Sequence, residues 1–311
     1  TVLIRGDRIE TIGPAGQVDI PAGAERLDAT GKFLTPGLID LHFHYSPSES
    51  GALDPALNNP INPELPLLFS ANGVTTLREM AIWIEDNELW LADIRARGLP
   101  TPHLLYSGPI LDGTNTAYPS ISRVLLDEMD ARRVTNELID QGATSLKIYF
   151  RLPLNLIRAV VEEADRRNVP VFAHLEIVDA RDAIRVGIDG IEHTRSVGPS
   201  LVSPKEGEAY RQGVLLESMH RAPNVGSGPL WAGLDPSGAR ADALIELMLE
   251  RQVALDATLA VFEPAFDEEG AEQTWAMVQN MATFFSLSSA WRSLTYSSHC
   301  PKVSVFGSMA P

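Results

Sequence analysis

Two histidines spaced two residues apart, His42 and His44, are the first candidates for chemistry in this sequence of 311 residues. They end an apolar run, residues 33–44, that is typical of a short buried strand. Residues i and i+2 of a strand point to the same face, and two converging imidazoles can hold a divalent metal at about 2.0–2.1 Å. The spacing therefore predicts a metal site, although a His-x-His pair on an exposed strand can also be solvated surface.

Three further ionisable residues lie in or at the end of predicted strands. His174 closes the run 169–174, His193 lies near the end of the run 190–194, and Lys147 lies within the apolar run 145–150. A single histidine at a strand end is often a hydrogen-bonded structural residue, so the joint placement carries the prediction.

Lys147 needs a separate explanation, because a protonated amine cannot bind a metal and its burial beside a dication is costly. Burial lowers the pKa of a lysine and favours the neutral amine. A neutral amine can react with carbon dioxide to form a carbamate, whose two oxygens could bridge two metals. The alternative is an ion pair of Lys147 with Glu79 or Glu176.

The elements that must position these residues alternate between helices and short β-rich runs. The predicted strands are residues 33–44, 74–79, 103–108, 145–150, 169–174, 190–194 and 253–259, and predicted helices include 156–167, 179–187 and 241–251. This alternation predicts a parallel α/β architecture. A barrel of eight units fits better than an open nucleotide-binding sheet, since no Gly-x-Gly-x-x-Gly follows a strand. Catalytic groups of such barrels lie at the carboxyl ends of the strands.

The chain begins with a separate β unit. Residues 2–5 and 8–12 flank Gly6 and Asp7, and a Gly-Asp link between β-type segments predicts a hairpin. We expect a small N-terminal β unit at residues 1–34 and the barrel at 35–311.

Composition excludes several classes of protein. The net charge of −16 opposes binding to nucleic acid or to anionic membranes, and no run of 18 apolar residues occurs. The single cysteine, Cys300, excludes an intrachain disulfide. The sequence favours the cytoplasm, and secretion or a periplasmic location stays open because the chain starts at Thr1.

Several motifs resemble the amidohydrolase superfamily. Residues 36–44 (PGLIDLHFH) resemble its signature, and residues 73–76 (GVTT), 146–149 (LKIY), 173–174 (AH) and 190–193 (GIEH) follow in the family's order. The resemblance is closest to imidazolonepropionase-like and Xaa-dipeptidase-like members. It implies a distorted TIM (β/α)8 barrel whose N-terminal β unit belongs to a β-sandwich.

The resemblance also implies a binuclear zinc centre. His42 and His44 would bind the first metal, His174 and His193 the second, and a carboxylated Lys147 would bridge them. A metal-activated hydroxide would then hydrolyse an amide, peptide or cyclic amide C–N bond in a small-molecule or dipeptide-like substrate. Lactone or phosphotriester hydrolysis on the same site is an alternative.

The sequence departs from the family near its end. His299 stands where family members carry an aspartate that ligates a metal and serves as general base, and the chain stops at Pro311, before the family's last barrel helix and sandwich strands. We expect His299 to ligate metal or transfer protons in that position. An impaired fragment or a pseudoenzyme is therefore an alternative, and homo-oligomers would cover the groove left by a missing helix.

Two smaller predictions concern the substrate pocket. Tyr149 lies two residues after Lys147 and would point to the same face, where it would contact substrate or pack within the barrel. Residues 195–240, rich in Gly, Pro and Ser, predict a long insertion at the catalytic rim that is either a lid or a flexible loop.

Overall fold

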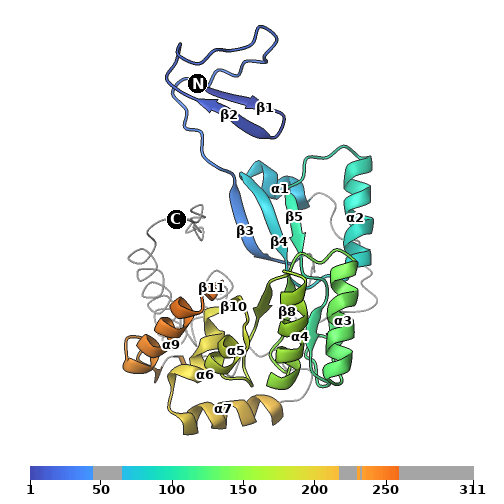
Figure 1. Cartoon of the computed structure of the whole chain (residues 1–311), viewed down its shortest axis with the longest axis vertical. Helices are drawn as coiled ribbons and strands as arrows, with labels where there is room; N and C mark the ends of the chain where they lie inside the picture. Colours follow the sequence, from blue (N-terminus) through green and yellow to red (C-terminus); the bar gives the residue numbers. More distant parts are fainter. Residues whose placement is uncertain (45–64, 217–229, 232, 259–311) are drawn as a thin grey trace, which may run out of the picture. The chain divides into compact units, whose positions relative to one another are not determined.

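The structure is a computed structural model that describes residues 1–44, 65–216, 230–231 and 233–258 (Figure 1). The chain divides into two compact units, Thr1–Pro36 and Gly37–Pro311. In the first unit, β1 (Val2–Arg5) and β2 (Arg8–Ile12) form the predicted antiparallel hairpin. Gly6 turns the hairpin with φ 61°, a conformation that glycine adopts without steric cost.

The second unit is an α/β structure built on parallel strands. Its strands are β3 (Leu38–Phe43), β4 (Val74–Glu79), β5 (His103–Tyr106), β6 (Ile110–Asp112), β7 (Ser122–Val124), β8 (Leu146–Ile148), β9 (Val171–Ala173), β10 (Gly190–Glu192) and β11 (Ala254–Asp256). They form a sheet β3-β4-β5 and a sheet β11-β10-β9-β8-β6-β7, and every pairing is parallel. Apart from the extra strand β7, neighbours in space follow one another in the chain. The α/β class is confirmed, and the eighth predicted barrel strand falls outside the described residues.

Helices connect these strands. They are α1 (Leu65–Ala71), α2 (Ile84–Ala96), α3 (Glu128–Asp140), α4 (Leu154–Arg166), α5 (Ala180–Val186), the 3-10 helix η1 (Thr194–Val197), α6 (Gly198–Leu201), α7 (Pro204–Leu216) and α9 (Ala239–Glu250). Helix α5 begins and ends as predicted, because the Asp179 side chain accepts the Arg181 N–H at 2.9 Å and Gly187 ends the helix at φ 106°. No helix in the described ranges is long and apolar enough to cross a membrane.

The strand predicted at residues 103–108 is confirmed over its first four residues and is shorter in the structure. Strand β5 ends at Tyr106, and the chain resumes as β6 at Ile110, in the other sheet. Gly108 adopts φ 74°, and Pro109 follows it without a backbone N–H for a sheet. Strands β6 and β7, each three residues long, were not among the predicted strands.

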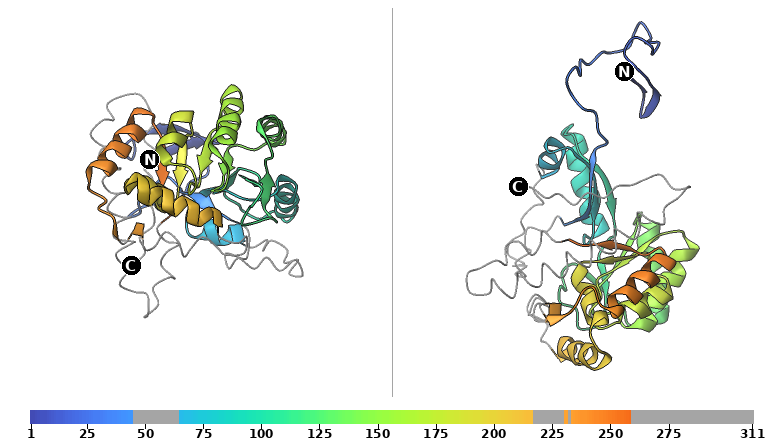
Figure 2. Two further views of the ribbon diagram at one scale, coloured as in Figure 1. Left: turned by 90° about the horizontal axis from the view of Figure 1, so that it is seen from below. Right: turned by 90° about the vertical axis from the view of Figure 1, so that its left-hand side faces the viewer.

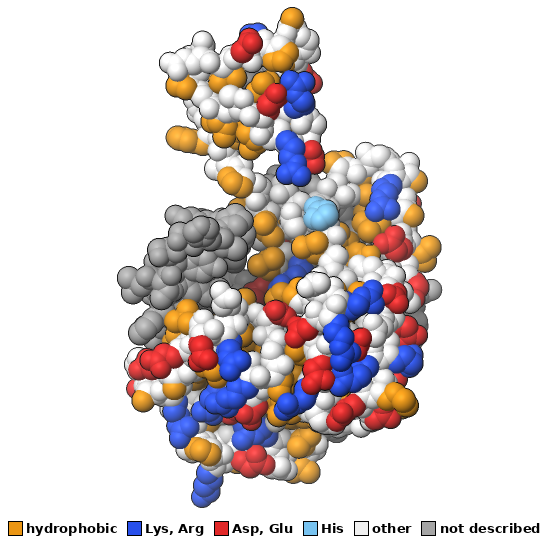
Figure 3. Space-filling view, in the orientation of Figure 1, with side chains coloured by type: hydrophobic (Ala, Val, Ile, Leu, Met, Phe, Trp, Pro, Cys, Tyr) orange, Lys and Arg blue, Asp and Glu red, His pale blue; other side chains and the backbone are white. Residues whose placement is uncertain are grey.

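Helices α3 and α4 lie side by side and cover the six-stranded sheet with apolar faces, and Figure 2 shows the same region from two further directions. Leu138 and Val160 belong to the main buried cluster, together with Ile148 of β8. The outer faces carry ion pairs such as Arg167 with Asp140 at 2.7 Å. Figure 3 accordingly shows mixed acidic and basic side chains over these helices.

The insertion predicted at residues 195–240 lies between β10 and β11, and the part that the structure describes is largely helical and not a flexible loop. Helices η1, α6 and α7 occupy much of it, and the residues of η1 and α6 are buried. Trp231 is fully buried, and a Cβ on Gly198 would lie 2.5 Å from its indole nitrogen. The buried helices η1 and α6 are therefore packed against the body of the unit, and Gly198 permits the close approach of Trp231.

Candidate metal centre at the strand ends

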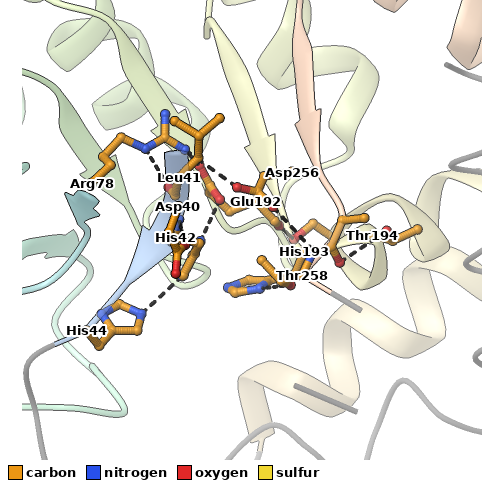
Figure 4. Close-up of polar contacts among 12 residues, drawn as sticks. Asp40, Leu41, His42, His44, Arg78, Glu192, His193, Thr194, Asp256 and Thr258 are labelled. Atoms are coloured by element: carbon orange, nitrogen blue, oxygen red, sulfur yellow. Dashed lines mark hydrogen bonds and ion pairs between the residues drawn. The ribbon is translucent and has the colours of Figure 1, made fainter. Parts of the chain in front are cut away.

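His42 projects from the end of β3 toward Glu192 of β10, and His44 lies beside it on the side away from β10 and β11 (Figure 4). Their Nε2 atoms lie 3.0 Å apart, and the ring centroids are 4.9 Å apart. Two unprotonated nitrogens repel each other at this distance unless a proton or a cation lies between them. The two Nε2 atoms are therefore close enough to bind one cation together.

His174 and His193 extend this pair into a chain of four imidazoles. The His193 ring lies 4.6 Å from that of His42 and 4.8 Å from that of His174, measured between centroids. Burial lowers the pKa of His42 and His193 well below the usual range, and lowers that of His174 to about 4. All three rings are neutral near pH 7, the form in which imidazole binds metals.

Lys147 is almost fully buried, at 1% exposure, and its amine has no hydrogen-bond partner among the described residues. Burial lowers its pKa to about 8, against the raising effect of nearby Glu192. Neither alternative ion pair is found, since no salt bridge joins Lys147 to Glu79 or Glu176 in the part of the chain described. The lowered pKa makes the neutral, reactive form of the amine more accessible near pH 7 than for an exposed lysine.

Buried charged residues that sequence reasoning missed surround His42. Glu192 of β10 lies 2.6 Å from His42 Nδ1 through Oε2, and Arg78 of β4 donates to Glu192 Oε1 at 2.7 Å (Figure 4). Asp256 of β11 lies 3.9 Å from the same guanidinium, and burial raises its pKa to about 6. One ligand atom each from His42, Glu192 and Asp256 fall within 4.8 Å of one another, a spacing at which a cation could be held.

A second buried carboxylate, Glu176, was predicted only as a partner for Lys147. Its Oε1 lies 3.0 Å from His174 Nε2 and accepts from Arg195, and its Oε2 accepts from the Tyr210 hydroxyl. Although burial opposes ionisation, Arg195 and these hydrogen bonds lower the pKa of Glu176 to about 2. The carboxylate is therefore a permanent charge beside His174. Its spacing, two residues after His174, was a signal in the sequence.

Of the two remaining predicted site residues, Tyr149 and His299, the structure describes Tyr149. The Tyr149 ring lies 4.8 Å from the His174 ring and 5.7 Å from that of Tyr118, which brings it to the histidine cluster. His299 lies outside the described residues.

Comparisons with known proteins give a consistent picture. No family model matches the chain. Dihydroorotase from Mycobacterium leprae is 27% identical over 202 residues, which is 61% of this chain and 43% of the relative. Dihydroorotase from Lactobacillus leichmannii is 51% identical over 45 residues, 14% of this chain and 10% of the relative.

Solved structures share the fold at low identity. Ochratoxinase from A. niger superposes with a TM-score of 0.55 and 18% identity, covering 82% of this chain and 60% of that protein. A candidate prolidase from Bifidobacterium longum gives 0.60 and 21%, with 91% and 63% covered. Molinate hydrolase gives 0.59 and 15%, with 87% and 62% covered. The chain has the fold of the amidohydrolase superfamily. It spans less than two thirds of each of these amidohydrolase-fold proteins and less than half of the dihydroorotase from Mycobacterium leprae.

Amidohydrolases generally use divalent metals, and the residues at these strand ends fit such ions. The buried Nδ1 of His174 and the buried amine of Lys147 have no hydrogen-bond partner among the described residues. Buried polar atoms are nearly always satisfied in proteins, so two orphans beside neutral histidines indicate a missing group. Imidazole nitrogens suit zinc and other borderline divalent metals.

Proposed function

We propose that this chain is a metal-dependent hydrolase of the amidohydrolase type that cleaves the C–N bond of an amide, peptide or cyclic amide. The observation that supports the proposal is the convergence of four imidazoles from the ends of β3, β9 and β10 near a buried lysine whose amine has no hydrogen-bond partner in the described part of the chain. A purely structural cluster would satisfy the amine of Lys147, because an unpaired buried amine destabilises the fold.

In this proposal His42 and His44 hold one metal, and His174 and His193 hold a second. Lys147 would join the two sites as a carbamate formed from its neutral amine and carbon dioxide. Bound divalent ions, proposed to be zinc, would supply a water of lowered pKa and would polarise the scissile carbonyl. The neutral state of His42, His174 and His193 keeps their lone pairs available, and the burial of these three rings limits access of bulk water.

The proposed substrate class is argued from the relatives and from the position of Tyr149. Relatives and neighbours are named for a cyclic amide and for peptide or amide substrates, as dihydroorotase, candidate prolidase and ochratoxinase. Tyr149 is proposed to contact the substrate, since its ring edge lies against His174 at the rim. We therefore expect a compact substrate with one cyclic or dipeptide-like amide.

The test is metal analysis of freshly purified protein, combined with hydrolysis assays on dihydroorotate, N-acyl amino acids and Xaa-Pro dipeptides. We expect bound zinc or another divalent metal and hydrolysis of at least one class, with both lost in His42→Ala. His103→Ala is the matched control, because His103 opens β5 with an exposed side chain and lies at the amino end of its strand. Protein without metal, together with unchanged hydrolysis in His42→Ala, would refute the proposal.

A further inference from the structure

Two of the clustered histidines each form a hydrogen bond with a buried glutamate, and each glutamate accepts a hydrogen bond from a buried arginine. In the first set Arg78 donates to Glu192 Oε1 at 2.7 Å, and Glu192 Oε2 lies 2.6 Å from His42 Nδ1. Arg78 also donates to the carbonyl of Leu41 at 2.7 Å and covers the Phe172 ring at 3.9 Å, so its position is fixed from three sides.

The second set repeats this connection on the other side of the cluster. Arg195 donates to Glu176 Oε1, which lies 3.0 Å from His174 Nε2, and the Tyr210 hydroxyl donates to Glu176 Oε2. Glu176, Arg195 and His174 are 2%, 6% and 3% exposed, so water does not compete for these bonds.

Both carboxylates dictate which nitrogen of their histidine carries the proton. An ionised carboxylate only accepts hydrogen bonds, so the ring nitrogen facing it must be the N–H. His42 therefore carries its proton on Nδ1 and turns Nε2 toward His44. His174 carries its proton on Nε2 and leaves Nδ1 buried without a hydrogen-bond partner among the described residues.

We propose that Arg78–Glu192 and Arg195–Glu176 are two positioning pairs that select opposite ring nitrogens, Nε2 of His42 and Nδ1 of His174, as the metal-facing ligands. This inference rests on the proposed function. It also assigns Glu192 a role behind His42 and not as a direct ligand, because both of its oxygens are occupied by the Arg78 guanidinium and the His42 ring. Such outer partners commonly change metal affinity 10- to 100-fold.

Replacement of each glutamate by glutamine gives different results at the two pairs. In Glu192→Gln, Arg78 requires the amide oxygen, which leaves the NH2 group facing His42 Nδ1. That nitrogen must then accept, and the proton moves to Nε2, the nitrogen needed for metal. Arg195 and His174 both contact Oε1 of Glu176, so in Glu176→Gln the amide oxygen takes that position. The NH2 group then faces the Tyr210 hydroxyl, which can accept a hydrogen bond. His174 therefore keeps its proton on Nε2, and only the charge is lost.

The experiment combines 15N spectra of the histidine rings in metal-free protein with zinc affinity measured by chelator competition. Spectra of His42→Ala and His174→Ala assign the two rings. We expect Nδ1–H at His42 and Nε2–H at His174 in the wild type. Glu192→Gln should invert the His42 tautomer and weaken zinc binding 10- to 100-fold, whereas Glu176→Gln should keep the tautomer and weaken binding less than tenfold. The control is Asp112→Asn. Asp112 is a buried carboxylate that accepts hydrogen bonds from backbone N–H groups, and its replacement should change zinc affinity less than threefold.

Several results would overturn the positioning pairs. A wild-type His42 protonated on Nε2 would do so even if no variant folds. Equal losses of zinc affinity in the two glutamine variants, with unchanged tautomers, would show that charge and not ring orientation matters. Loss of all zinc binding in Glu192→Gln without a change of tautomer would make Glu192 a direct ligand. A wild-type protein that shows the expected tautomers but binds no zinc would instead refute the proposed function.

Discussion

Neutralising Asp112 should stabilise the protein above pH 6. Asp112 ends β6 and is fully buried, and its Oδ1 accepts the backbone N–H groups of Gly113 and Arg151, each at 2.9 Å. Burial raises its pKa from 3.8 to about 6, although these hydrogen bonds act in the other direction. Asparagine keeps an oxygen for both N–H groups and resembles the protonated acid in shape.

The sign of the effect follows from the raised pKa. A carboxyl group whose pKa is higher in the folded state contributes its full stability below pH 3.8 and loses it as the pH rises through about 6. A shift of about 2 units corresponds to roughly 3 kcal/mol. The advantage of Asp112→Asn in the free energy of unfolding should therefore be about 1.5 kcal/mol at pH 5 and about 3 kcal/mol at pH 7, with little further change at pH 8.

Urea unfolding of both proteins between pH 4 and pH 8 measures this difference, because groups shared by the two proteins cancel. Exposed Asp140, which pairs with Arg167 at 2.7 Å on the outer face of α3, is the matched control. Asp140→Asn should change stability by less than about 1 kcal/mol. A difference between Asp112→Asn and wild type that is flat across this pH range, or a variant less stable at pH 7, would refute the reasoning.

Two further substitutions test the packing around the candidate metal centre. Lys147→Met should raise the free energy of unfolding of the metal-free protein by about 1–3 kcal/mol, because it removes a buried amine that has no partner within the described residues. It should also lower the bound metal per chain in metal analysis. Gly190→Ala should destabilise the protein by about 1–3 kcal/mol in urea unfolding, because the new Cβ would lie 2.5 Å from the Phe172 ring inside the sheet. A stable Gly190→Ala protein, or a destabilised Lys147→Met protein, would contradict these packing arguments.

Strand positions were predictable from the sequence because short apolar runs between helices have few alternative structures. Strand β4 matches its prediction, residues 74–79, at both ends, and β8 and β9 lie within theirs. Because the carboxyl ends of parallel strands point the same way, the predicted strand ends place the histidines on one side of the structure. The structure brings all four histidines together.

The charged residues behind the histidines could not be predicted in the same way. Arg78 and Glu192 lie in different predicted strands, and their contact joins residues 114 positions apart. Periodicity shows which side chains share a face of one strand, but it does not show which strands face each other across the interior. The packed helices α6 and α7 were missed for a related reason, because glycine and proline there permit close packing that composition alone represents as a loop.

The backbone conformation at the end of β10 could not be predicted from the strand pattern. Consecutive strand residues point to opposite faces, so Glu192 and His193 should not both reach the histidine cluster. They do so because His193 adopts φ 62°, a left-handed conformation that is costly for a residue with a side chain, at about 1–3 kcal/mol. Its Nδ1 lies 2.7 Å from the hydroxyl of Thr258, which itself has φ 45°, and Thr194 N donates to the Ala257 carbonyl at 3.3 Å. Contacts from the end of β11 thus hold the strained turn, and one strand end supplies both the carboxylate behind His42 and the imidazole beside it.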